Sequence, residues 1–153
     1  MSEKAALLAD TLQKQDEILS ELRSVVLRQR DALKEGRVAE LQQLMSELRH
    51  VSVRCQAIET KRQRVTDDLA KEMGTAAVVS EIVRALPEAD AAVLDESADR
   101  LMRTVSSLKA EMSILSRLMD EAKMLNQMLI TEWQKLGQKF MGGGMLGAFD
   151  ARI

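Results

Sequence analysis

Apolar side chains recur along the first part of the chain in alternating steps of three and four residues. The series begins at Ala5 and Leu8 and ends at Leu33, with glutamine in two of its slots, Gln15 and Gln29. Such spacing places one apolar stripe on a single face of an α-helix. We therefore predict one helix from near the start of the chain to about residue 35.

A glycine interrupts this stripe. Gly36 lies two residues after Lys34, and a glycine just after a basic last turn is typical of a helix C-terminus. The stripe restarts at Leu41, continues to Leu69 and ends before Gly74. Because the connection around Gly36 is short, we predict that the two helices form an antiparallel hairpin.

The last stripe is the most regular and runs from Leu94 to Phe140 without a slip. Heptads sustained over this length are typical of coiled-coil-like packing, so we predict one long C-terminal helix. Between Gly74 and Pro87 we predict a short helix with Thr75 as its N-cap. The predicted fold class is all-α: an antiparallel helical hairpin plus a long C-terminal helix in an elongated coiled-coil-like bundle, with a short helix in the connection.

Domain organisation is predicted to be simple, with one helical domain over 1–140 and a flexible tail over 141–153. The tail contains three consecutive glycines, which disfavour a regular helix or strand. It also carries large apolar residues, which are unusual in an inert solvated tail: Met141, Met145, Leu146 and Phe149. Two interpretations stay open, namely folding onto a partner and plain fraying of the chain end.

Composition supports helices and narrows the function. Hydrophobic residues make up 46% of the chain, yet aromatic residues only 2%, which is unlike the core of a sheet protein. The formal net charge of −2 gives no basic field for nucleic acid. We interpret the basic run Lys61, Arg62 and Arg64 as a solvated helix face, although Arg62 also occupies a slot of the second stripe. With no apolar run of about 20 residues and no signal peptide, we predict no membrane insertion and a cytoplasmic location.

Few residues in the chain are candidates for catalysis or metal binding. His50 is the single histidine and Cys55 the single cysteine, so neither has a second residue of its kind for a metal pair or a disulfide. Cys55 lies on the apolar stripe, where a buried inert thiol is expected. The glycines at 142–144 lack the Lys-Ser/Thr of a phosphate loop. We predict that the protein is not an enzyme and has no cofactor, metal site or catalytic residue.

The last stripe offers more apolar surface than one neighbouring helix covers, because Ile114, Leu118, Leu125 and Met128 lie beside it. Asn126 occupies a stripe slot, where a polar residue fixes register or partner choice. Methionines in this region suit a surface that repacks around different partners, although gap filling in a bundle is the alternative. The predicted partner-binding residues are Leu118, Leu125, Asn126, Met128, Leu129, Trp133, Leu136, Phe140, Met141, Met145, Leu146 and Phe149.

Three stretches carry a family resemblance over nearly the whole chain. They are LRQRDALKEGRVAELQQLMSELR around the glycine turn, KRQRVTDDLAKEMG at the end of the second arm, and EAKMLNQML in the last helix. Together they resemble the FlgN family of flagellar type III export chaperones. One departure from the family pattern is Arg37, which follows the glycine where the family more often has an acid or another capping residue.

The resemblance implies a cytosolic all-helical chaperone. Its clients would be the C-terminal helices of hook-associated proteins 1 and 3, the hook–filament junction proteins. The chaperone would prevent their premature assembly and deliver them to the gate or ATPase components of the export apparatus. The family contacts the gate through an aromatic residue, and in this tyrosine-free chain that role would fall to Trp133 or Phe140, or be met differently.

A structural coiled coil is the alternative function. In that interpretation the last helix pairs with its own copy over 94–140, and Asn126 sets the register. A monomer and a homodimer therefore both stay open at this stage.

Overall fold

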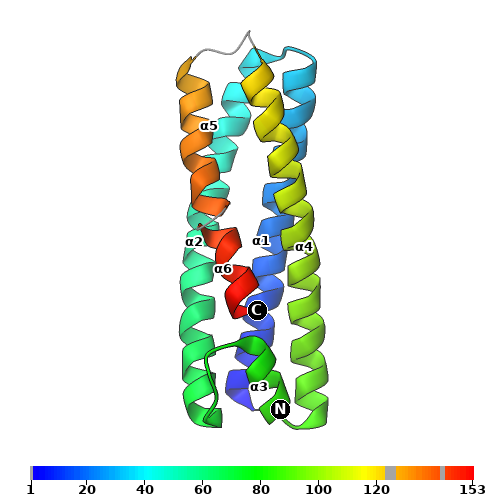
Figure 1. Cartoon of the computed structure of the whole chain (residues 1–153), viewed down its shortest axis with the longest axis vertical. Coiled ribbons are helices and arrows are strands. Elements are labelled where there is room, and N and C mark those ends of the chain that lie inside the picture. The colour runs from blue at the N-terminus through cyan, green and yellow to red at the C-terminus, as the bar shows by residue number, and fades with distance from the viewer. Residues whose placement is uncertain (1, 123–126, 142–143) are drawn as a thin grey trace.

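The computed structural model describes residues 2–122, 127–141 and 144–153, with all their side chains except those of Met128, Ala148 and residues 150–152. The described part is helical and contains no strand. Its helices, shown in Figure 1, are α1 Glu3–Lys34, α2 Val38–Met73, α3 Val79–Ala85, α4 Glu88–Glu121, α5 Gln127–Phe140 and α6 Met145–Arg152. The all-α prediction is confirmed.

The turn between α1 and α2 is built around Gly36. This residue has φ 69°, a left-handed conformation that favours glycine. Its N–H donates to Leu33 O and the N–H of Arg37 donates to Ala32 O, which closes the end of α1 as a Schellman motif. Two long helices therefore leave this turn in opposite directions, and the predicted hairpin is confirmed.

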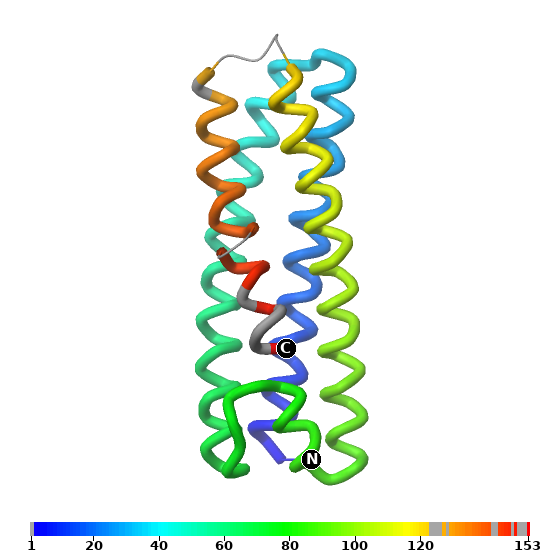
Figure 2. Tube along the Cα trace, viewed as in Figure 1, coloured from blue at the N-terminus to red at the C-terminus, as the bar shows by residue number. Residues whose placement is uncertain are grey.

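The helices form an elongated bundle with four corners. α1 packs along both α2 and α4, while α5 lies between α2 and α4 on the far side of the bundle from α1. α6 continues in the direction of α5, so that the two together fill the fourth corner (Figure 2). The core runs the length of the bundle between the facing stripes.

The prediction of one continuous last helix is wrong. α4 ends at Glu121, Ala122 has an extended ψ of 104°, and α5 runs back alongside α4 (Figure 1). A helix over 88–140 would be about 80 Å long, whereas the 36 residues of α2 span about 54 Å. The unbroken helix would project its apolar stripe into water. Reversal instead buries Leu129, Trp133, Leu136 and Phe140, each stabilising the fold by about 1.5–3 kcal/mol.

The end of the chain, predicted as a flexible tail, is helical over Met145–Arg152. Its large side chains at Met145, Leu146 and Phe149 are 7%, 0% and 0% exposed. Gly144 precedes α6 and approaches the backbone closely: a Cβ there would lie 2.3 Å from Lys139 O. The glycine thus permits the tight passage from α5 to α6 that a larger residue would obstruct.

The connection from α2 to α4 holds the predicted short helix, α3. It begins at Val79 with Val78 as its N-cap, and the Thr75 hydroxyl donates to Ala76 O instead of capping the helix. Thr75 was therefore the wrong cap. Pro87 is the N-cap residue of α4, in a position where a proline starts a helix without losing a hydrogen bond.

Ion pairs join neighbouring helices along the outside of the bundle. Arg28–Glu47 and Arg54–Glu21 link α1 to α2, Arg30–Glu111 links α1 to α4, and Arg49–Glu132 links α2 to α5. Arg30–Glu111 is partly buried, and the more exposed pairs each contribute about 0–1 kcal/mol. These pairs help to set the register between neighbouring helices. The Arg49–Glu132 pair, for example, holds the reversed α5 at one position along α2.

Candidate functional site

The predicted partner-binding residues gather in the fourth corner of the bundle. The corner, which we define as α5 and α6 with the faces of α2 and α4 beneath them, buries seven of these residues: Leu129, Trp133, Leu136, Phe140, Met145, Leu146 and Phe149. Leu118 and Met141 are partly buried against the core. Leu125, Asn126 and the side chain of Met128 lie outside the described residues. Most of the described partner-binding residues are therefore covered by the chain itself.

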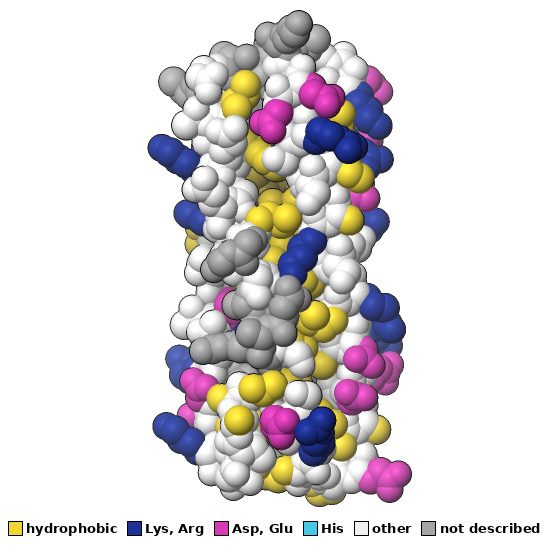
Figure 3. All heavy atoms as spheres, in the orientation of Figure 1, with side chains coloured by type: hydrophobic (Ala, Val, Ile, Leu, Met, Phe, Trp, Pro, Cys, Tyr) yellow, Lys and Arg dark blue, Asp and Glu magenta, His cyan; other side chains and the backbone are white. Residues whose placement is uncertain are grey.

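A groove separates α5 from α4 in this corner. It has a volume of about 970 Å³, and Figure 3 shows apolar atoms at the bottom of the hollow between the two helices. Its lining residues are Met112, Ser113, Ser116, Arg117, Asp120, Trp133, Gln134, Gly137, Gln138 and Met141. Small or polar side chains form the walls, and sulfur and indole groups form the floor. The fourth corner is therefore open along the side between α4 and α5.

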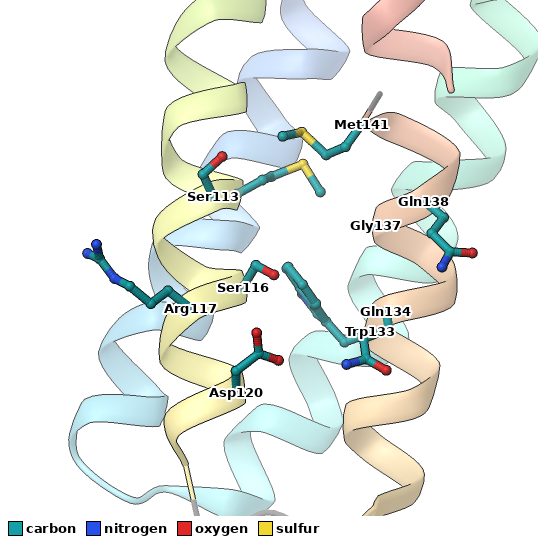
Figure 4. A pocket seen from close by; sticks show the side chains of 10 residues that line it. Ser113, Ser116, Arg117, Asp120, Trp133, Gln134, Gly137, Gln138 and Met141 are labelled. Atoms are coloured by element: carbon teal, nitrogen blue, oxygen red, sulfur yellow. The ribbon is translucent and has the colours of Figure 1, made fainter. Parts of the chain in front are cut away.

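Trp133 is the largest residue of the groove. Its ring reaches from α5 towards Ser116 of α4 (Figure 4) and is 4% exposed. The indole Nε1 is buried and has no hydrogen-bond partner among the described residues. Gly137 stands one turn away, and a Cβ there would meet the Trp133 ring at 3.7 Å, an ordinary contact. Packing within the chain therefore does not require a glycine at this groove position.

A buried ion pair lies beneath α6. Arg62 of α2 is fully buried, and its Nε donates to Glu59 Oε1 at 2.5 Å, with Glu59 6% exposed. Nη1 and Nη2 of Arg62 and Oε2 of Glu59 have no partner among the described side chains. Phe149 of α6 covers Arg62, its ring centroid 5.4 Å from Arg62 Cζ. The prediction that Arg62 lies on a solvated face is wrong, while its slot in the second stripe pointed to the observed burial.

Glutamines extend the polar character of the core. Gln15 and Gln29, which interrupt the stripe of α1, are both fully buried, and both side-chain amides lack partners among the described residues. Each unpaired buried polar group costs about 1–3 kcal/mol. The stripe pattern predicted the burial of both residues, but it contained no signal for the unsatisfied amides.

The remaining candidates for chemistry are separate from this corner. Cys55 is buried, and burial raises the pKa of its thiol to about 12, with smaller opposing effects from Arg54, which lowers it, and Glu21, which raises it. A thiol with this pKa is a poor nucleophile at neutral pH. His50 is exposed. In the described ranges there is no acid, histidine and cysteine cluster able to hold a metal ion, and none of the helices is long and apolar enough to cross a membrane.

Comparison with known protein families finds a match that extends to the end of α5 and does not include α6. Residues 1–140 match the family described as FlgN protein. No curated protein and no solved structure matches the chain. The matched range covers the hairpin, α3, α4 and the reversed α5, and this family is one of flagellar export chaperones. The chain therefore belongs to the FlgN family.

Proposed function

We propose that this chaperone binds amphipathic C-terminal helices of hook-associated proteins 1 and 3 at its fourth corner. It holds these clients in the cytoplasm, prevents their premature assembly and delivers them to the export apparatus. The client helix contacts the apolar stripe of α5 and the core surface that α6 covers in the free protein. The partner-binding residues of α5 then contact the client, and those of α6 give up their place to it. In the free protein the same residues complete the bundle.

The groove between α4 and α5 is the observation that carries this proposal. Trp133 and Met141 already line the groove, while α5 is held to the bundle along its other side through Arg49–Glu132. A client helix enters along the groove and takes the place of α6 against α2 and α4. This is helix-in-groove recognition, in which apolar anchors recur at helical spacing.

The exchange conserves buried area. α6 contributes three large apolar side chains to the core, namely Met145, Leu146 and Phe149. An amphipathic client helix returns a similar number, so the apolar area lost when α6 leaves is regained on binding. The net affinity then depends on the remaining contacts along α5, which suits a complex that must dissociate at the export apparatus.

Delivery to the export apparatus depends on the same opening. Trp133 and Phe140, the two aromatic residues proposed for the gate contact, are 4% and 0% exposed in the closed bundle. A gate that recognises either residue would therefore bind the chaperone only when the corner is open.

Trp133 is the single tryptophan, which gives a direct test. We would label the full chain with 5-fluorotryptophan and titrate it with purified hook-associated protein 1 or 3, following the one fluorine resonance. Client binding at the corner is expected to shift or broaden this resonance. Binding without any change at Trp133 would move the site elsewhere.

A blocking variant tests the groove itself. Gly137→Leu adds a side chain against the groove floor, and we expect at least tenfold weaker client binding with little change in melting temperature. Ser20→Leu, at an exposed position of α1, is the matched control and should bind normally. Equal affinity in the two variants would reject the groove as the client's path.

The alternative, self-association through a continuous last helix, loses its structural basis because α4 ends at Glu121. Light scattering at low concentration distinguishes the two functions. A monomer that binds hook-associated proteins supports the chaperone. An obligate dimer that ignores these clients would restore the structural coiled coil.

A further inference from the structure

The buried pair Arg62–Glu59 has hydrogen-bonding capacity that the described chain does not use. Arg62 is the largest of the fully buried side chains, and one guanidinium N–H, on Nε, reaches Glu59 Oε1. The two remaining nitrogens of the guanidinium and the second carboxylate oxygen have no partner among the described residues. An unused donor group and an unused acceptor therefore belong to one ion pair.

Phe149 covers Arg62 without satisfying the pair. The ring centroid lies 5.4 Å from Arg62 Cζ, which is cation–π contact through the aromatic ring. A phenylalanine ring provides no lone pair for the N–H groups of Nη1 and Nη2, and no donor for Glu59 Oε2. α6 thus closes the core over polar groups that a different helix would complement better.

We propose that a client helix occupying the place of α6 presents a side-chain carboxamide, from glutamine or asparagine, to the Arg62–Glu59 pair. This inference rests on the proposed function and names the side-chain chemistry that the corner selects. The amide oxygen accepts from the free N–H groups of Arg62, and the amide NH₂ donates to Glu59 Oε2. One planar group satisfies both needs because it carries an acceptor and a donor on the same carbon.

Charge excludes an ionised client side chain at this position. The guanidinium is already neutralised by Glu59, so a client carboxylate would bring a second negative charge to one cation, next to an acceptor that it cannot satisfy. A client lysine would bring a second cation beside Arg62. A leucine would leave every unused group buried and unpaired. The pair therefore discriminates in favour of a neutral side chain with both donor and acceptor.

A peptide series tests the selection on the full-length chaperone. The probes are synthetic peptides of the C-terminal helix of hook-associated protein 1, in which each core-facing position in turn carries Gln, Leu or Glu. Dissociation constants come from calorimetry. We expect one position at which the Gln peptide binds at least tenfold tighter than both the Leu and the Glu peptide.

Two chaperone variants assign that preference to the pair. Glu59→Gln is isosteric and leaves Arg62 with an uncompensated positive charge, so the preferred residue at that position should change from Gln to Glu. Arg62→Met with Glu59→Leu makes the site apolar, and the preference should change to Leu. Thermal melting of each variant confirms that it is folded before binding is measured.

The outcomes separate this inference from the function on which it rests. A preference for Gln that changes as described supports carboxamide selection. Client binding with no preferred position, or with the same preference in all three chaperones, overturns the selection and leaves the chaperone function intact. If neither the peptides nor the intact hook-associated protein binds the wild-type chain, the proposed function fails, and carboxamide selection fails with it.

Discussion

The guanidinium of Arg62 on α2 lies beneath the ring of Phe149 on α6, 5.4 Å from its centroid. These residues are 87 positions apart, and the contact joins the end of the chain to a charged layer in the middle of the bundle. Both side chains are fully buried. Whether α6 is packed in the bundle therefore determines whether this charge is covered by an aromatic ring or by another group.

Arg62 and Glu59 are expected to be strongly coupled in stability. Arg62→Met alone leaves the Glu59 carboxylate buried without its partner and should lower the free energy of unfolding by about 3–5 kcal/mol. Replacing both residues, Arg62→Met with Glu59→Leu, should be neutral or stabilising because no charge remains in the core. Urea unfolding of the single and double variants measures the difference. Equal losses in both would show that the pair is not energetically linked.

Two glycine substitutions in the fourth corner should have opposite effects. Gly144→Ala places a Cβ 2.3 Å from Lys139 O, so the backbone must shift, and we expect a loss of about 1–3 kcal/mol with faster amide exchange in α6. Gly137→Ala makes an ordinary 3.7 Å contact inside α5 and should gain about 1 kcal/mol from helix propensity. Thermal unfolding and hydrogen exchange of the two variants provide the comparison. A stabilising Gly144→Ala would contradict the close passage from α5 to α6.

Alkaline pH should weaken the fold through Cys55. Burial raises the pKa of this thiol from 9.0 to about 12, so the folded state retains the proton that the unfolded state releases. The stabilising contribution is complete below pH 9 and is lost as pH rises from 9 to about 12, at about 1.4 kcal/mol per pH unit. Urea titrations at pH 8 and pH 10 measure the effect. Cys55→Ala is the control, and its stability should depend less on pH over this interval.

Trp133→Ala should cost about 3–5 kcal/mol, because the ring is 4% exposed and its removal leaves a cavity between α4 and α5. Trp133→Phe retains most of the apolar contact and should cost less. Denaturation and client binding are measured on the same two variants. An unchanged melting temperature in Trp133→Ala would mean that the ring is not part of the packed core in solution.

Overall dimensions test the reversal of the last helix. The closed bundle should have a length close to the roughly 54 Å of α2, whereas an unbroken helix over 88–140 would extend to about 80 Å. Small-angle X-ray scattering of the monomer gives the maximum dimension. A value near 80 Å would show that α5 extends away from α4.

The helices and their buried faces follow from the sequence alone. The three-four spacing from Ala5 to Leu33 and from Leu41 to Leu69 specifies which face of each helix avoids water, whatever its neighbour is. Gly36 marks the turn for a local reason, since a left-handed residue closes the end of α1. The two glutamines in the stripe of α1 also follow the pattern, because both side chains are buried in the core together with the apolar residues of that stripe.

Tertiary structure alone decided where the last stripe turns and what it packs against. A heptad pattern describes which face of a helix is apolar, and it can continue unchanged through a reversal of the chain. The pattern from Leu94 to Phe140 is therefore the same for one straight helix and for two helices folded back on each other. The reversal follows from the length of the α1–α2 hairpin, beyond which an apolar stripe would have no cover. The pairing of Arg62 with Phe149 likewise depends on that reversal, because only a chain folded back along α2 brings its end to the buried charge.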